Sequence, residues 1–232
     1  MEFAQRVLKD TKKVLIPIKD PIRAQGAQAY MKNIAPYLGM SAPDRRAATK
    51  PVFKALPIPT AKELGSAAAL LYAQREREYA YAANDLLDHF IEVADRNFLK
   101  SEVAGLITTK SWWDTVDGLG SAAVSPLSWK YPSRALMKEW IGAPNIWLNR
   151  AAIGHQRGRR AETDTEFLLW LCHQRAKERE FFIVKAIGWA LRDITAFDKP
   201  AVRQFLADHP DLGRVAVREA ERGLNRLRSL NR

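Results

Sequence analysis

Helix start signals recur along the chain, and they restrict the fold more than any other feature of the sequence. Asp20 precedes Pro21, which is the usual order of an N-cap and a first helical residue. Thr60 and Glu63, three residues apart, form the pattern of a capping box. Strand signals are scarce, because the best candidate, residues 14–18, is short and contains a proline. The sequence therefore predicts an all-α protein.

The predicted helices are short and numerous. About a dozen segments with helical periodicity are separated by Pro, Gly or Asp turns. No shift in composition marks a second domain, so we expect one domain over residues 1–232. Paired short helices over this length indicate either an irregular bundle or a stack of helical pairs of the HEAT type. No repeat of fixed period decides between these two arrangements.

The chain is strongly basic, with 37 Lys and Arg against 26 Asp and Glu and a net charge of +11. The excess lies at the two ends, since residues 1–60 carry 11 basic and 4 acidic side chains and residues 150–232 carry 17 and 11. This charge favours a polyanionic partner, with nucleic acid as the leading candidate. A basic surface that only maintains solubility is the alternative.

Several classes of protein are disfavoured. The single cysteine, Cys172, provides no disulfide framework, which fits a reducing, cytoplasmic setting. No signal peptide or membrane span is apparent, so we expect no membrane partner. The four histidines lack metal-ligand spacing and no nucleotide-binding loop is present, so we expect neither a metal nor a cofactor.

Two tryptophans and two carboxylates are concentrated in KSWWDTVDGLG, residues 110–120. At 100° per residue, Lys110, Trp113 and Asp117 share a helix face, whereas Trp112 points elsewhere, toward the expected core. The first acid of this segment follows Ser111 by three residues and is expected to cap the helix as part of a capping box. The alternative is that both rings are core residues and both acids are caps or surface groups.

A second aromatic residue with basic neighbours lies in FFIVKAIGWALRDI, residues 181–194. Trp189 shares a face with Lys185 and Arg192, on the side away from the apolar stripe. Such a face suits phosphates and sugar or base rings. A ring that packs under the lysine and arginine stems is the alternative. The predicted core stripe is Ile183, Ala186, Ile187, Ala190 and Ile194.

Further arginines lie in residues 146–160. Arg150 is in an otherwise apolar segment and could be either a DNA contact or a partly buried, paired arginine. Arg157, Arg159 and Arg160 follow as a cluster that would form a phosphate-binding patch.

Four segments together resemble the AlkD-type DNA alkylation repair glycosylases. They are QAYMKNIAPYLGMSAPDRR (28–46), KSWWDTVDGLG (110–120), IWLNRAAIGHQ (146–156) and EFFIVKAIGWALRDI (180–194), and the resemblance runs from about residue 20 to 225. It implies a solenoid of HEAT-like helical repeats whose concave basic face holds duplex DNA. It also implies hydrolysis of the N-glycosidic bond of alkylated purines such as 3-methyladenine and 7-methylguanine, the first step of base excision repair.

The resemblance assigns roles to individual residues. The family's catalytic acid corresponds to Asp117, and its active-site tryptophans correspond to Trp113 and Trp189. Arg150 corresponds to the arginine that grips DNA, and Tyr30 to an aromatic residue at the edge of the site. Many relatives have a basic pair where this chain has Asn149-Arg150, which removes one expected phosphate contact. The other residues expected to bind DNA are Lys110, Lys185, Arg192, Arg157 and Arg159.

The resemblance also implies a monomer that needs no obligate protein partner and acts at the bacterial nucleoid. Two other functions remain open from the sequence. One is a catalytically silent relative that recognises unusual DNA structures, and the other is a HEAT-type scaffold that binds proteins.

Overall fold

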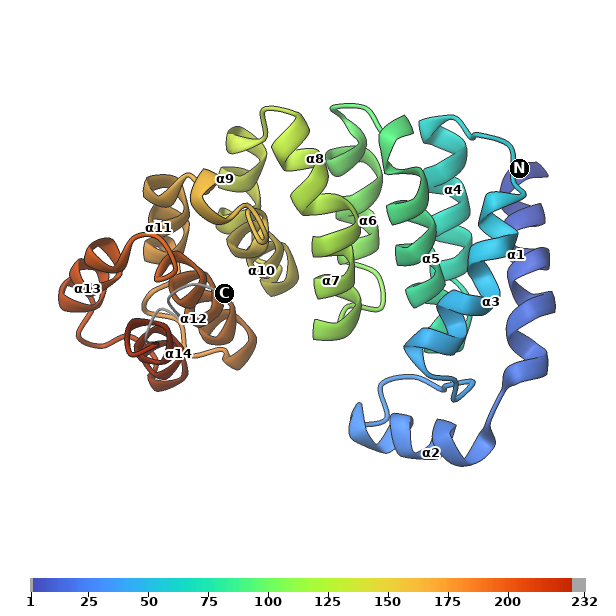
Figure 1. Cartoon of the computed structure of the whole chain (residues 1–232), viewed down its shortest axis with the longest axis horizontal. Coiled ribbons are helices and arrows are strands. Elements are labelled where there is room, and N and C mark those ends of the chain that lie inside the picture. Colours follow the sequence, from blue (N-terminus) through green and yellow to red (C-terminus); the bar gives the residue numbers. More distant parts are fainter. Residues whose placement is uncertain (1, 227–232) are drawn as a thin grey trace, which may run out of the picture. The chain divides into compact units, whose positions relative to one another are not determined.

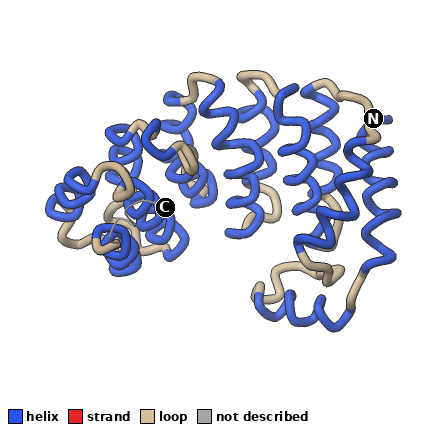
Figure 2. Tube along the Cα trace, viewed as in Figure 1, coloured by secondary structure: helices blue, strands red, loops and turns tan. Residues whose placement is uncertain are grey.

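A computed structural model describes residues 2–226, and in this part of the chain helices are joined by loops and turns (Figure 2). The described residues contain no β-strand, which confirms the prediction of an all-α protein. The best strand candidate, residues 14–18, lies at the end of α1 (Glu2–Leu15) and in the 3-10 turn Ile16–Ile18. None of the described helices is both long and apolar enough to cross a membrane.

The predicted caps are present. The carboxylate of Asp20 accepts hydrogen bonds from the amides of Ile22 and Arg23, both at 3.0 Å, at the start of α2 (Pro21–Tyr30). Thr60 and Glu63 form the reciprocal bonds of a capping box at the start of α4 (Ala61–Tyr72). Each bond satisfies an amide that a helix start leaves without a partner, so the sequence sets these two boundaries locally.

The residues group into two compact units, Met1–Leu127 and Ser128–Arg232. The expectation of one domain over residues 1–232 stays a prediction. Within each unit, helices adjacent in sequence pack against one another, as α4 does with α5 and α9 with α10. That is the local organisation expected of stacked helical pairs.

In the first unit, α1 packs against α3 (Ala42–Lys54) and α4, and α5 (Arg77–Phe90) packs against the same two helices (Figure 1). The unit continues with the 3-10 turn Ile91–Val93, the π-helical turn Leu99–Val103 and α6 (Ala104–Ile107). Next, α7 (Trp113–Leu119) runs through a second π-helical segment, Gly120–Val124, into α8 (Ser125–Lys130), within which the unit ends at Leu127. The core contains fully buried side chains, among them Val7, Leu64, Leu71, Leu86 and Leu119.

In the second unit, α12 (Phe181–Ile194) is the central element. It packs against α10 (Ile146–Gly154), α11 (Thr165–Gln174) and most extensively against α14 (Arg214–Leu224). The helices α9 (Arg134–Gly142) and α13 (Lys199–Asp208) and the 3-10 turn Arg160–Glu162 complete the unit. The predicted core stripe of α12 is confirmed, because all five of its residues are buried: Ile183, Ala186, Ile187, Ala190 and Ile194.

Helix α2 differs from every other long helix because none of its residues is buried. It lies across the lower ends of its neighbours in Figure 1 and is held through the loop that follows it. The amides of Leu38 and Gly39 donate to the buried carboxylate of Glu78 on α5, at 2.8 and 2.7 Å. Gly39 adopts a φ of +96°, and the amide of Asp20 donates to the Leu38 carbonyl at 2.9 Å. The start of α2 is therefore fastened to a loop that α5 fixes.

Substitution of Gly39 by alanine is expected to detach α2. A Cβ atom there would lie 2.0 Å from the carbonyl oxygen of Asp20, and a left-handed φ is strained for alanine. Displacement of this loop would take two amide donors from the buried carboxylate of Glu78, so the melting temperature should fall, and amide hydrogen exchange of residues 21–30 should accelerate at least about tenfold. The control is Gly26→Ala inside α2, where a Cβ meets nothing within 4 Å and the helix should gain stability. Unchanged exchange in Gly39→Ala would disprove this mode of attachment.

Candidate functional site

The start of α7 differs from the predicted capping box. Trp112, not Ser111, is the residue before the helix, and it provides no side-chain cap. The Ser111 hydroxyl donates backward to the carbonyl of Ile107 at 2.6 Å. Trp112 and Trp113 are both partly buried, so the two rings do not divide into one core residue and one surface residue as expected. Lys110 precedes the helix, and it therefore does not share a helix face with Trp113 and Asp117 as expected.

Asp114 is not a cap but half of a buried ion pair. The guanidinium of Arg77, at the start of α5, grips its carboxylate with two hydrogen bonds of 2.9 and 2.6 Å. The two side chains are only 2% and 8% exposed. Arg77 also donates to the carbonyl of Lys110 at 2.6 Å and to the hydroxyl of Thr115 at 3.1 Å. Burial by itself lowers the pKa of Arg77, but the hydrogen bonds and charge of Asp114 outweigh it and raise that pKa.

Two tyrosines extend this network. The Tyr81 hydroxyl donates to the second carboxylate oxygen of Asp114, and the hydroxyls of Tyr37 and Tyr81 lie 3.3 Å apart. Asp114 is therefore held by three side-chain hydrogen bonds, two from Arg77 and one from Tyr81. Every donor comes from α5, so the first carboxylate of WWDTVD is committed to fixing α7 on α5.

Asp117 lies one turn further along α7 and is half-buried, as is Trp113. The adjacent Gly118 allows the helix to approach α5, because a Cβ atom there would lie 2.2 Å from the amide nitrogen of Asn84. Asn84 in turn donates to the carbonyl of Thr115 at 3.4 Å. The position of Asp117 is thus defined on both sides, by the Arg77–Asp114 pair before it and by the close approach at Gly118 after it.

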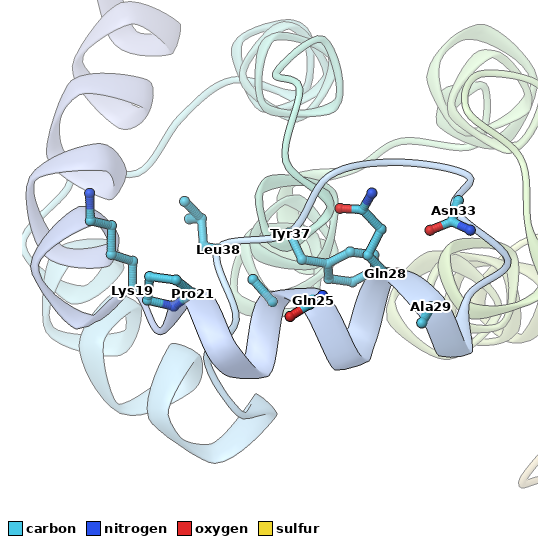
Figure 3. A pocket seen from close by; sticks show the side chains of 9 residues that line it. Lys19, Pro21, Gln25, Gln28, Ala29, Asn33, Tyr37 and Leu38 are labelled. Atoms are coloured by element: carbon cyan, nitrogen blue, oxygen red, sulfur yellow. The ribbon is translucent and has the colours of Figure 1, made fainter.

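Lys110 and Tyr30, both expected to bind DNA, have different surroundings. The ammonium group of Lys110 donates to the carbonyl of Gln74, next to the end of α4, and burial lowers its pKa. Tyr30 ends α2 and is 74% exposed. Beside α2 lies an open pocket of about 570 Å³ whose polar wall is formed by Gln25, Gln28 and Asn33 (Figure 3). No carboxylate lines it, so it offers no oxygen-rich metal site.

In the second unit, Trp189 lies among three cations. The side-chain charges of Arg150 and Arg157 each lie 5.0 Å from the centre of its ring system, and that of Lys185 lies at 5.7 Å. The ring is only partly buried. The face of an indole attracts cations, by about 0.5–2 kcal/mol each. The expectation that Trp189 shares a face with Lys185 is confirmed, whereas the contact of Arg192 is with Glu219 and not with the ring.

Arg150 itself is buried, with 4% of its surface exposed. Its guanidinium donates to the carbonyl of Phe182 at 2.7 Å, across from α10 to the first turn of α12. The surroundings of Arg150 therefore match the alternative given for it, a partly buried and paired arginine. Its charge lies beneath Trp189 instead of projecting into solvent. Asn149, which replaces the second basic residue, is also buried and its side-chain amide donates to the carbonyl of Trp140 at 2.7 Å.

Lys185 and Arg192 share one partner that the sequence did not reveal. Both contact the carboxylate of Glu219 on α14, at 2.8 and 2.5 Å, and Arg222 contacts it at 2.9 Å. Glu219 is 3% exposed. The hydrogen bond from Lys185 is the main reason that the pKa of Glu219 lies below its usual value. One buried carboxylate thus holds three cations in fixed positions, and the group keeps a positive excess.

The arginines after α10 diverge. Arg157 lies over Trp189, whereas Arg159 lies 5.6 Å from the ring centre of Trp129 and donates to the hydroxyl of Ser128 at 2.7 Å. Burial lowers the pKa of Arg159. The predicted phosphate patch is therefore divided between two tryptophans and does not form one cluster with Arg160, which is exposed.

The predicted residues thus form two groups, one in each unit. Trp113 and Asp117 share α7, while Arg150, Arg157, Lys185, Trp189 and Arg192 gather on α10, α12 and the turn after α10. Sequence reasoning missed Arg77 and Glu219, whose only local signal is a charge at a position of apolar periodicity. Within residues 2–226 no cluster of three or more His, Cys, Asp or Glu side chains could hold a metal ion.

The fold and these clusters define an all-α, HEAT-like helical-repeat protein, and comparison with known proteins gives its family. A solved structure, described as a predicted DNA alkylation repair enzyme from Enterococcus faecalis, is similar with a TM-score of 0.80 and 28% sequence identity. The match covers 90% of this chain and 98% of that one. No curated protein sequence gives a significant match.

The sequence profile of the DNA alkylation repair enzyme family matches residues 11–224, so the chain belongs to that family. The resemblance deduced from the sequence is confirmed, and the HEAT-like arrangement holds over the irregular bundle.

Removal of Arg77 should destabilise the protein strongly. Arg77→Ala leaves the buried carboxylate of Asp114 without its cation, which costs about 3–5 kcal/mol of unfolding free energy. Denaturant unfolding measures this. Arg23→Ala removes two ion pairs, with Asp20 and Asp44, of an arginine that is 63% exposed, and it should cost less than about 1 kcal/mol. A double variant, Arg77→Met with Asp114→Asn, should recover much of the loss. If its cost in unfolding free energy equalled the sum of the costs of the two single substitutions, the two residues would not be coupled.

Proposed function

We propose that the protein is a DNA glycosylase that hydrolyses the N-glycosidic bond of cationic alkylated purines in duplex DNA and so begins base excision repair. The proposed substrates are 3-methyladenine and 7-methylguanine, with bulky N3 and N7 adducts as further candidates. Membership of the DNA alkylation repair enzyme family supports DNA as the partner. The protein is proposed to act as a monomer, without an obligate protein partner, at the bacterial nucleoid in the cytoplasm.

One observation carries the proposal, namely the different environments of the two carboxylates of WWDTVD. The carboxylate of Asp114 accepts hydrogen bonds from Arg77 and Tyr81, and these contacts fix the position of α7. Asp117 is half-buried on the same helix. Asp114 therefore has a structural role, and its contacts fix the helix that carries Asp117. Such an arrangement is expected when a carboxylate must be positioned within about half an ångström for chemistry.

The reaction needs only one such carboxylate. Alkylation at N3 or N7 gives the purine a positive charge, so the base departs as a neutral molecule and requires no strong acid. Ordinary glycoside hydrolysis differs, because one of its two carboxyl groups must protonate the leaving group. Positive charge develops instead on the deoxyribose, as an oxocarbenium ion. Asp117 is proposed to stabilise that charge and to orient the attacking water.

The aromatic and basic residues have supporting roles in the proposal. The face of an indole stabilises a cation, so Trp113 and Trp189 are suited to a sugar that becomes positively charged. Arg150, Arg157 and Lys185 surround Trp189 and supply the positive potential that attracts the phosphate backbone. Further DNA contacts are proposed for Tyr30, Lys110, Arg159 and Arg192.

A catalytically silent protein that recognises unusual DNA structures is the second candidate. It would bind DNA with the same basic groups, and Asp117 would have no catalytic role. An assay for release of free methylated base from alkylated DNA distinguishes the two functions. A protein-binding scaffold is less consistent with three cations around an accessible tryptophan.

Asp117→Asn should remove base release and retain DNA binding. The variant has the same shape but no charge to stabilise the oxocarbenium ion, so single-turnover excision of 7-methylguanine should fall at least about 100-fold. Affinity for the same duplex should stay within about threefold. The control is Asp88→Asn, which makes the same chemical change at an exposed position on α5. Excision at the wild-type rate by Asp117→Asn would show that another residue is the catalytic acid.

Arg150→Ala should weaken both binding and excision. It removes the charge below Trp189 and the bond to the Phe182 carbonyl. Anisotropy measurements over a salt series should show a lower affinity and a smaller salt dependence.

A matched control separates this effect from a packing defect. Arg175 also donates to a backbone carbonyl, that of Ile141 at 2.9 Å, and Arg175→Ala should leave the salt dependence unchanged. Identical salt dependence for Arg150→Ala and the wild type would contradict the proposed role.

A further inference from the structure

Helix α14 carries a row of arginines that neither the sequence motifs nor the proposed site includes. Arg214, Arg218 and Arg222 follow one another at intervals of four residues, and Arg226 continues the spacing just after the helix ends. All four are exposed. Residues at i and i+4 are neighbours on a helix surface, so the guanidinium groups lie in sequence along one side of α14.

This row is electrostatically unfavourable for the isolated protein. Like charges at i and i+4 repel by a few tenths of a kcal/mol per pair. Arg214 opens the helix, where the macrodipole disfavours a cation, and no acid lies in the first turn. Among the described residues, Arg214 and Arg218 form no ion pair. Glu221, the exposed acid three residues after Arg218, lies beyond ion-pair distance from it.

The row is attached rigidly to the cluster around Trp189. Arg222 and Lys185 contact the same oxygen of Glu219, at 2.9 and 2.8 Å. Two glycines also bring α12 and α14 together. A Cβ at Gly188, next to Trp189, would lie 2.9 Å from the Cα of Ala216, and one at Gly223 would lie 2.2 Å from the hydroxyl of Thr195. Arg222 therefore joins the arginine row of α14 to Lys185 and Arg192 on α12 through Glu219.

We infer that the arginine row of α14 binds backbone phosphates of duplex DNA and extends the interface beyond the nucleotide under repair. Three arginines at 1.5 Å rise per residue span about 12 Å, and one DNA strand presents a phosphate about every 3.4 Å along its axis, so the row covers about three phosphates. Continuity with the Trp189 cluster favours DNA over another polyanion. The inference rests on the proposed function for its ligand, but not on catalysis.

The test uses undamaged duplex DNA, so that base release does not enter. Arg214→Gln with Arg218→Gln removes two charges and keeps good helix formers at both positions. A plot of log affinity against log salt concentration should become shallower by about 1.8, because each phosphate contact contributes about 0.9 to the slope. The charge-conserving pair Arg214→Lys with Arg218→Lys should restore the wild-type slope, because lysine also binds phosphate as a point charge.

The matched control is on α1. Lys9 and Lys13 are exposed and also lie four residues apart, so Lys9→Gln with Lys13→Gln makes the same change of net charge elsewhere. This control should retain the wild-type slope. An equal loss in both double variants, or an unchanged slope in the α14 variant, would overturn the inference. If the wild type releases no methylated base yet the α14 variant alone loses salt dependence, the inference stands and the glycosylase proposal fails.

Discussion

Two adjacent buried charges at the start of α5 fix two other segments of the first unit in place. Arg77 and Glu78 are 3% and 2% exposed, and each is satisfied by a different segment. Arg77 holds Asp114 and the turn before α7, while Glu78 accepts the two amides that anchor the loop after α2. A buried charge without a partner costs several kcal/mol. If either segment moved away, Arg77 or Glu78 would become such an unpaired charge. The position of Asp117 depends on this arrangement.

Positive charge in the second unit is organised by the same principle. The cations there are not a diffuse surface layer, because Glu219 and the carbonyl of Phe182 fix the groups nearest to Trp189. Partial neutralisation by one buried carboxylate lowers the repulsion among Lys185, Arg192 and Arg222 without cancelling their excess charge. A preordered set of cations loses less side-chain entropy when it meets phosphates than flexible lysines would.

Local sequence patterns predicted the fold well, and the site only in part. The caps at Asp20 and Thr60 and the core stripe of α12 depend on residues within one or two turns, and the structure confirms them. The capping box at Ser111 was wrong because Asp114 prefers Arg77, a partner 37 residues away. Such long-range pairs carry no periodic signal. The identification of Asp117 came from ordered motifs of the family, not from geometry.

The lack of buried residues in α2 has a consequence for how this segment can evolve. None of its residues is fully buried, and it is connected to the rest of the unit by the bond from Asp20 to Leu38 and by the two loop amides that donate to Glu78. The exposed Ile22 and Tyr30 can therefore be exchanged without any compensating change in the packed helices. A segment with this freedom can diversify faster than the scaffold that carries it, so related chains can acquire new surface specificities here at almost no cost in stability.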